Sequence, residues 1–314
     1  MTEEKINWKE IKAIDGSLSP AYCAPADPER AKEAFEIYEM KVMAYTTFGG
    51  IFKRMGLQPG EEWKVLAMAN KGSVEAMIEE MDEAGVERVM MNAIRFWSQH
   101  DHKLISDITP EHVYEVMKKA KGRVIGGAGY NPFRIKESLE DIERAVKEYG
   151  FKYVWFHPIS FGMRPDDRRC YPLYTKCLEL GITVGMQVGH SAEVLTSEPG
   201  HPMAADNVAI EFPDLTIVLT HTGYPWIEEW CSMIWRHPNV YGMLNAYFPS
   251  GLQPETLRFV DSPRGRDKIL WGSHGFGIAR WVDEFVQLPI SDKTKKKVLR
   301  DNAMKAFKLE ELPE

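Results

Sequence analysis

The chain has 314 residues, of which 44% are hydrophobic and 27% charged, and its formal net charge is −7. This composition is typical of a globular protein with a sizeable core, and the acidic balance argues against nucleic-acid binding. No run of about 20 apolar residues predicts a membrane span. The four cysteines lack the spacing of a disulfide scaffold or a zinc ribbon, so we expect a cytoplasmic protein.

Short apolar runs alternate with amphipathic helical patterns along the chain. The runs predict strands over residues 11–14, 88–94, 124–130, 153–156, 182–188, 215–219, 240–244 and 268–271. One helix begins at Thr109 and ends near Lys121, and others span residues 135–149 and 173–180, with a glycine after each. Eight such units predict one domain, residues 1–314, folded as an α/β protein of the (β/α)8 TIM-barrel type.

One connection is far longer than the others. Residues 17–72 separate the first strand from its helix, and they are rich in aromatic residues and methionine, including Tyr45 and Phe48. A long excursion in a compact barrel is typical of a functional lid. A packed helical insertion or a dimer surface accounts for the pattern equally well.

Histidines fall where the predicted strands end. In a barrel of this type, the active site is built from side chains at the carboxyl ends of the strands. His157, His190, His221 and His274 occupy such positions. Because imidazole has a pKa near ~6.5, it serves as acid or base at neutral pH. We therefore predict catalytic roles for these four residues, with His274 as the general acid or base and with His190 and His221 polarising a carbonyl group.

Other polar residues at the predicted mouth are candidates for substrate binding. Arg95 fits a substrate carboxylate, although an ion pair with Asp101 or Asp15 is the alternative. In the charged loop 164–169, Arg168 is the best candidate to bind a substrate carboxylate. We expect most of the other charged residues of this loop to be solvated or paired with one another. The remaining candidates are Asp15, Asn131, Gln187 and Tyr224, together with Tyr45 and Phe48 to shield an apolar ring.

Several motifs resemble the amidohydrolase superfamily, in its amidohydrolase-2 branch, which includes carboxymuconate-semialdehyde and resorcylate decarboxylases. The matching stretches are residues 165–174, 187–190, 221–226, 237–241 and 268–273. The resemblance covers the chain from about residue 85 onward and residues 11–20 in outline. It implies a TIM barrel, a small-molecule substrate, a homodimer and, in most members, one divalent metal ion.

The chain departs from the family at the usual metal ligands. The first strand of the family ends in D-x-H-x-H, whereas here Ser17 and Ser19 replace both histidines. His274 stands where the family has a metal-binding aspartate, and Gln187 where many members have a histidine. Neutral hydroxyls are poor zinc ligands. We therefore expect no metal cofactor; the alternative is a rebuilt site in which the four histidines, perhaps with Asp15, bind one zinc or manganese ion.

These observations predict a metal-independent hydrolase or lyase. Its substrate would be small, cyclic, and bear a carbonyl or carboxylate group, and the reaction would be lactone or carbon–carbon hydrolysis or decarboxylation. One alternative is a metal-dependent hydrolase or decarboxylase with the rebuilt site. The other is a non-catalytic protein that binds small molecules, since loss of metal ligands is also how a barrel loses its activity.

Overall fold

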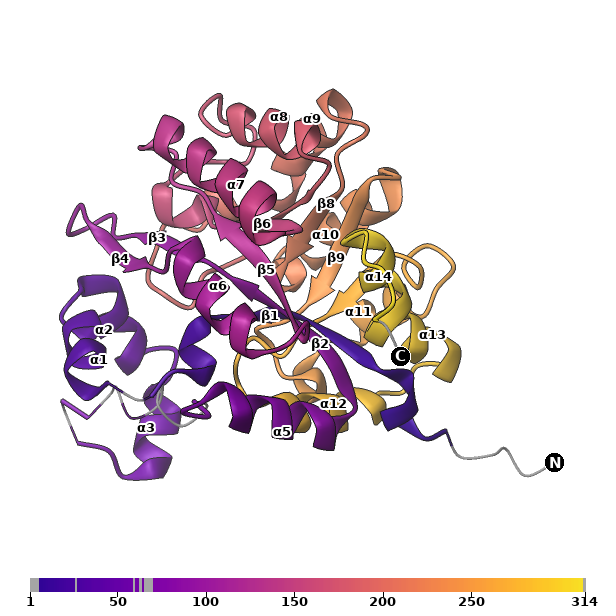
Figure 1. Ribbon diagram of the computed structural model, residues 1–314, viewed down its shortest axis with the longest axis horizontal. Coiled ribbons are helices and arrows are strands. Elements are labelled where there is room, and N and C mark those ends of the chain that lie inside the picture. Colours follow the sequence, from indigo (N-terminus) through magenta and orange to yellow (C-terminus); the bar gives the residue numbers. More distant parts are fainter. Residues whose placement is uncertain (1–5, 26, 59, 62–63, 65–69, 313–314) are drawn as a thin grey trace.

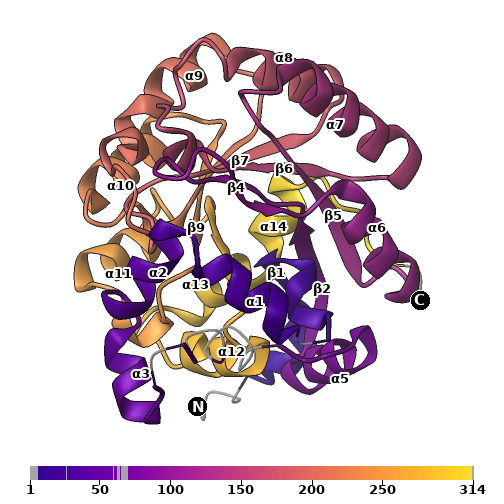
Figure 2. The ribbon, with the colours of Figure 1, turned by 90° about the vertical axis from the view of Figure 1, so that its left-hand side faces the viewer.

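The computed structural model describes residues 6–25, 27–58, 60–61, 64 and 70–312. Among these residues, eight strands form one parallel sheet in the order β1-β2-β5-β6-β7-β8-β9-β10. The strands are β1 (Ala13–Leu18), β2 (Val86–Asn92), β5 (Val124–Gly129), β6 (Tyr153–Phe156), β7 (Thr183–Gln187), β8 (Ile217–Thr220), β9 (Val240–Leu244) and β10 (Ile269–Trp271). Helices surround the strands (Figure 2), which confirms the predicted (β/α)8 barrel.

The helices alternate with the strands along the chain (Figure 1). They are α5 (Val74–Ala84), α6 (Pro110–Lys119), α7 (Ile135–Tyr149), α8 (Tyr171–Glu179), α9 (Ala205–Glu211), α10 (Ile227–Arg236), α11 (Pro254–Val260), α12 (Ile278–Val286), α13 (Asp292–Lys296) and α14 (Asn302–Ala306). Short 3-10 turns occupy Trp8–Ile11, Pro20–Cys23, Pro158–Phe161, Glu198–Gly200, Pro202–Ala204, His221–Gly223 and Pro249–Gly251, and a π-helical turn spans Lys297–Asp301. No helix of the described residues is both long and apolar enough to cross a membrane.

The helix ends follow the local sequence signals. Thr109 caps α6 in a capping box, in which its backbone N–H donates to His112 Nδ1 at 3.1 Å. Helix α7 spans the predicted residues and ends at Gly150, whose φ of 74° is the left-handed conformation that glycine adopts most readily. The capping residues therefore determine where these two helices begin and end.

Two hydrophobic layers hold the barrel together. The larger lies between the strands and the outer helices and includes Trp230, Trp271 and Trp281. The smaller fills the barrel interior with side chains from most of the strands, such as Met90, and α14 covers it with Ala303 and Ala306. Because close-packed interiors of this kind resist deformation, the strand ends are fixed relative to one another.

Strands β1 and β10 meet through a buried carboxylate. The Oδ1 atom of Asp15 accepts hydrogen bonds from the backbone N–H groups of Ser17 at 3.0 Å and of Ser273 at 2.9 Å, and the Ser273 hydroxyl donates to Oδ2. The first strand therefore runs to Leu18 and includes polar residues, whereas the sequence predicted that it would end at Ile14. Buried serine and aspartate side chains that bond to each other do not show the apolar pattern of a strand.

The insertion carries α1 (Pro28–Phe35), α2 (Tyr38–Tyr45) and α3 (Gly49–Met55), which lie together beside a short antiparallel hairpin of β3 (Arg95–Trp97) and β4 (Leu104–Asp107) (Figure 1). Glu39 of α2 is buried and accepts hydrogen bonds from Ser98 Oγ and the His100 backbone N–H. Thr47 Oγ1 donates to the Ala192 carbonyl, in the loop after β7. The insertion thus contacts the strand-end loops, and a role as a lid, as a packed helical insertion or as a dimer surface stays a prediction.

Candidate active site

Two of the predicted histidines face each other at the carboxyl ends of β8 and β10. The rings of His221 and His274 meet edge to face, with centroids 4.6 Å apart and an interplanar angle of 85°. Both residues have a left-handed backbone, with φ of 68° and 57°. Non-glycine residues adopt this conformation infrequently, and active sites are among the places where such residues cluster.

Asn245, which follows β9, joins these two histidines. Its Oδ1 accepts the backbone N–H of His221 at 2.7 Å, so its Nδ2 faces Ser17 and His274. Nδ2 donates to Ser17 Oγ at 3.0 Å, and both groups lie near His274 Nδ1, at 3.4 and 3.3 Å. Since the amide group and the serine hydroxyl both offer protons here, Nδ1 of His274 accepts, and the neutral ring carries its proton on Nε2.

Thr220 gives His221 the opposite arrangement. The hydroxyl of Thr220 lies 2.9 Å from His221 Nδ1, accepts from Trp155 Nε1 at 3.4 Å, and donates to the Met186 carbonyl at 3.3 Å. Because a hydroxyl has one proton to donate, this arrangement favours a proton on His221 Nδ1 that points to Thr220. The Nε2 atom of His221 then has a free lone pair.

The remaining ring nitrogens of the pair are open. Among the described residues, neither Nε2 of His221 nor Nε2 of His274 has a hydrogen-bond partner. Neither of these two atoms is fully buried. The pair therefore presents one acceptor and one donor to a molecule that enters the barrel mouth.

His157, at the end of β6, is the third histidine of this cluster. Its Nδ1 accepts the backbone N–H of Ser160 at 3.0 Å, so Nε2 carries the proton and faces Ser191 Oγ at 3.3 Å. Ser191 in turn donates to the carboxylate of Glu193. The ring also packs edge to face on Phe96, with centroids 4.3 Å apart. His157 is thus a hydrogen-bond donor held in place on both sides.

Burial keeps the three imidazoles uncharged. Desolvation lowers the pKa of His157 to about 3 and of His274 to about 4, and it lowers the pKa of His221 well below its ordinary 6.5. The neighbouring histidines add to the effect at His157 and His221. Burial also raises the pKa of the Glu193 carboxyl, which the hydrogen bond from Ser191 partly offsets. At neutral pH the cluster therefore works with neutral imidazoles.

The fourth histidine lies apart from these three. His190 is exposed, and its Nδ1 bonds to Ser197 Oγ at 2.7 Å. Its ring lies beside Tyr224 and Trp226, with centroids 6.2 and 5.5 Å away. Tyr224 is 40% exposed and also contacts Tyr247. These residues form an outer rim, and a catalytic role of His190 remains a prediction.

Other predicted site residues divide between the mouth and the supporting structure. Gln187 is buried, and its Nε2 lies 3.5 Å from Ser191 Oγ, beside His157. Asn131 is buried, and its Oδ1 accepts the Phe133 backbone N–H at 2.9 Å, so it shapes the loop after β5.

Three of the predicted substrate-binding residues belong to the insertion or to β1. Tyr45 is 53% exposed, whereas Phe48 packs into the small core of the insertion. Asp15 uses both oxygens to join β1 to β10. Its burial raises the pKa of this carboxyl to about 6. Asp15 thus has a structural role, and its predicted contact with the substrate stays a prediction.

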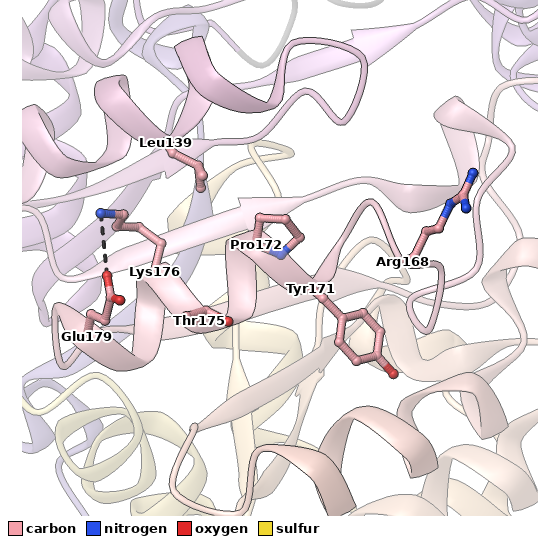
Figure 3. Close-up of a pocket in the computed structure, with 7 residues that line it drawn as sticks. All are labelled: Leu139, Arg168, Tyr171, Pro172, Thr175, Lys176 and Glu179. Carbon is pink, nitrogen blue, oxygen red and sulfur yellow. Dashed lines mark ion pairs between the residues drawn. The ribbon is translucent and has the colours of Figure 1, made fainter.

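The two arginines that were predicted to bind a substrate carboxylate lie away from the histidine pair. Arg95 belongs to β3 and pairs with Asp141 at 2.6 Å and Asp107 at 3.3 Å, the partners being different from those expected. Arg168 is exposed and lines a surface depression of about 480 Å³ (Figure 3). The other lining residues are Leu139, Tyr171, Pro172, Thr175, Lys176 and Glu179, and none of them is a histidine. This depression lies on the outer helices α7 and α8 and not at the barrel mouth.

Sequence reasoning did not identify Trp155, Thr220, Ser191 or Glu193. Trp155 lies between His157 and His221, with ring centroids 5.5 and 6.3 Å away. The two-residue alternation along β6, which puts Trp155 on the same face as His157, could have indicated it. No sequence signal indicates the loop residues Ser191 and Glu193.

Comparison with protein families shows that the chain belongs to the amidohydrolase family Amidohydro_2, whose model matches residues 54–309. It is accordingly an enzyme of the amidohydrolase superfamily, as the motifs predicted. Comparison with curated proteins returned no match.

Solved structures share the fold at low sequence identity. An uncharacterised TIM-barrel protein from Bordetella bronchiseptica is 24% identical, with a TM-score of 0.71 over 94% of this chain and 98% of that one. A 2,6-dihydroxybenzoate decarboxylase from Rhizobium is 17% identical, with a TM-score of 0.64 over 94% and 98%. A 5-carboxyvanillate decarboxylase from Novosphingobium aromaticivorans, complexed with manganese, is 17% identical, with a TM-score of 0.65 over 98% of both chains.

The donor atoms at the family's metal positions do not fit a divalent ion in this chain. Ser17 offers a neutral hydroxyl that is already bonded to Asn245, and Asp15 has both oxygens occupied. His157 has its Nδ1 engaged with a backbone N–H. In the part of the chain that the structure describes, no three His, Cys, Asp or Glu side chains are arranged so that they could hold a metal ion together. Divalent transition metals in proteins are held by imidazole, thiolate and carboxylate ligands.

Proposed function

We propose that this enzyme is a hydrolase or decarboxylase that acts on a small cyclic substrate bearing a carbonyl or carboxylate group, and that it uses histidine acid–base chemistry without a metal ion. The observation that carries the proposal is the facing pair of His221 and His274, one with an open acceptor and the other with an open donor. A base beside an oxyanion donor is the minimal apparatus for attack on a carbonyl group.

For a cyclic ester, water at the mouth loses a proton to Nε2 of His221 while its oxygen attacks the carbonyl carbon. The carbonyl π electrons move to oxygen, and Nε2–H of His274 donates to the forming oxyanion. When the intermediate collapses, the C=O bond forms again and the ring C–O bond breaks. The leaving oxygen then takes the proton from His221, so the imidazole returns to its neutral form.

The hydrogen bonds favour the reverse of the roles that the sequence predicted for these two residues. Ser17 and Asn245 both offer protons to His274 Nδ1, which makes its Nε2 a donor. Thr220 favours a free lone pair on His221 Nε2. A neutral imidazole that donates to an oxyanion suits the lowered pKa of His274, because the ring does not have to be charged to donate.

The test measures turnover of lactones, cyclic diketones and hydroxybenzoates before and after exhaustive dialysis against EDTA, with metal content determined on the same samples. We expect kcat/KM to be unchanged by chelation for the substrate that is turned over. Activity that is lost on chelation and restored by manganese or zinc would contradict the metal-free proposal and favour a rebuilt histidine site.

A further inference from the structure

We infer that the substrate of this site reacts as an uncharged cyclic carbonyl compound, such as a lactone or cyclic diketone, and not as a carboxylate anion. The inference rests on the proposed function, because it names the substrate class of the same histidine pair. It follows from the groups that surround the pair, from the position of the arginines, and from the carboxylates on one side of the mouth.

The groups that bond to the histidine pair are uncharged. They are the hydroxyls of Ser17 and Thr220 and the amide of Asn245. Within the described residues, no lysine or arginine forms a hydrogen bond or ion pair with His221 or His274. A carboxylate that is moved from water into such a site loses its hydration without gaining a counter-charge, which is far more costly than moving a ketone or ester.

The arginines that the sequence offered for a carboxylate are committed elsewhere. The guanidinium of Arg95 is neutralised by Asp107 and Asp141 and also lies 3.4 Å from Ser138 Oγ. Arg168 lies on the outer surface beside α8. Bidentate recognition by arginine, which is how proteins most often hold a substrate carboxylate, is therefore not provided by either residue.

Two carboxylates lie on the far side of Ser191 from His157. Glu193 is joined to His157 through Ser191, and the charge of Glu39 raises the cost of ionising Glu193. Glu39 itself is 1% exposed. Negative charge on this side of the mouth opposes a second anion, whereas it does not repel an uncharged carbonyl compound.

The half-buried indole of Trp155 provides an apolar surface between His157 and His221. Its N–H is bonded to Thr220, so its orientation is fixed. A flat ring that packs on this indole would bring a ring carbonyl within reach of the adjacent histidines, which is why the inference specifies a cyclic substrate.

The test compares two ligands of similar size that differ in charge: phthalide, an uncharged lactone, and 2-methylbenzoate, an anion. Binding to the wild-type protein is measured by titration calorimetry at pH 7.5. We expect phthalide to bind at least about tenfold more tightly, because the anion pays the desolvation cost. Equal or tighter binding of 2-methylbenzoate would overturn the inference.

A pair of variants tests the contribution of charge. Glu193→Gln keeps an acceptor for Ser191 but removes the negative charge, so we expect 2-methylbenzoate to bind several-fold more tightly and phthalide to bind as before. Glu198→Gln is the matched control, because this exposed residue of the same loop pairs with Arg164. If Glu193→Gln leaves the ratio of the two affinities unchanged, the assigned effect of Glu193 is wrong.

Turnover separates this inference from the proposed function. If phthalide is preferred in binding but no compound of the substrate panel is turned over, the uncharged site stands and the proposed enzyme activity fails. If hydroxybenzoates are decarboxylated efficiently by the metal-free protein, the proposed function stands and the inference of an uncharged substrate is overturned.

Discussion

The rings of His221 and His274 meet edge to face, 4.6 Å between centroids, yet their Nδ1 atoms have different partners. Nδ1 of His221 meets the hydroxyl of Thr220, whereas Nδ1 of His274 meets Ser17 and Asn245. Two identical side chains thereby acquire opposite open groups, one acceptor and one donor. The division of roles lies in their hydrogen-bond partners and not in the imidazoles themselves.

The first prediction concerns variants that remove Nε2 of His221 or of His274. With the substrate identified by the panel, His221→Gln should lower kcat by about 10²–10⁴-fold through loss of a general base. His274→Gln should lower it by about 10²–10³-fold through loss of an oxyanion donor. His112→Gln is the control, since glutamine preserves the capping box of α6. Full activity of either active-site variant would remove that residue from its role.

The barrel was predictable from sequence because each βα unit repeats the same local pattern. The strands over residues 153–156 and 240–244 lie at their predicted positions. The first strand does not, because its later half buries Asp15 and Ser17, whose polar groups bond to Ser273 after β10 and to Asn245 after β9. The hairpin that carries Arg95 was missed, since strands of three and four residues leave too little periodicity to detect.

The sequence predicted the site residues that directly follow strands, but not those whose positions depend on loops. His157, His221 and His274 come together because parallel strands deliver their carboxyl ends to one face. His190 does not join them, since Gly189, with φ of 86°, turns the chain, and the His190 N–H donates to the Tyr224 carbonyl. The positions of such loop residues depend on contacts that are distant in sequence. The homodimer and the cytoplasmic location also remain predictions from sequence.

The second prediction concerns the positioning role of Asn245. Asn245→Asp keeps an acceptor for the His221 N–H but places a carboxylate about 3.4 Å from His274 Nδ1. An opposite charge at this distance should raise the pKa of His274 from about 4 by roughly 1–3 units. NMR titration of the histidine ring resonances measures the change. Asn131→Asp is the control, and an unchanged pKa of His274 in Asn245→Asp would contradict the bonding pattern.

The third prediction concerns stability at acid pH. Unfolded histidine titrates near 6.5, whereas folded His157 and His274 have pKa values of about 3 and 4. Between about pH 4 and 6.5 the unfolded chain therefore binds more protons, so the free energy of unfolding falls as the pH falls. Each group contributes a slope approaching about 1.4 kcal/mol per pH unit. Asp15, with a pKa raised to about 6 from 3.8, acts in the opposite direction between these two values.

Denaturant unfolding between pH 7.5 and 5 measures this slope. His157→Asn supplies an oxygen for the Ser160 N–H but cannot be protonated in this range, so its stability should depend less on pH than that of the wild type. Asp15→Asn should make the stability depend more steeply on pH, because it removes the carboxyl group whose titration opposes that of the histidines. Identical pH dependence in wild type and His157→Asn would show that folding does not lower the pKa of His157.

The fourth prediction distinguishes a structural Asp15 from a catalytic one. Among the described residues no backbone ladder pairs β1 with β10, so the two hydrogen bonds that Ser273 donates to Asp15 join these strands, while the bond from the Ser17 N–H lies within β1. Asp15→Ala leaves two buried backbone N–H groups without their acceptor and should cost about 2–5 kcal/mol of stability. Asp15→Asn keeps the shared acceptor and can donate to the Ser273 hydroxyl, so we expect a change within about 1 kcal/mol and an unchanged kcat. Loss of activity in a stable Asp15→Asn protein would instead show that the carboxylate takes part in the chemistry.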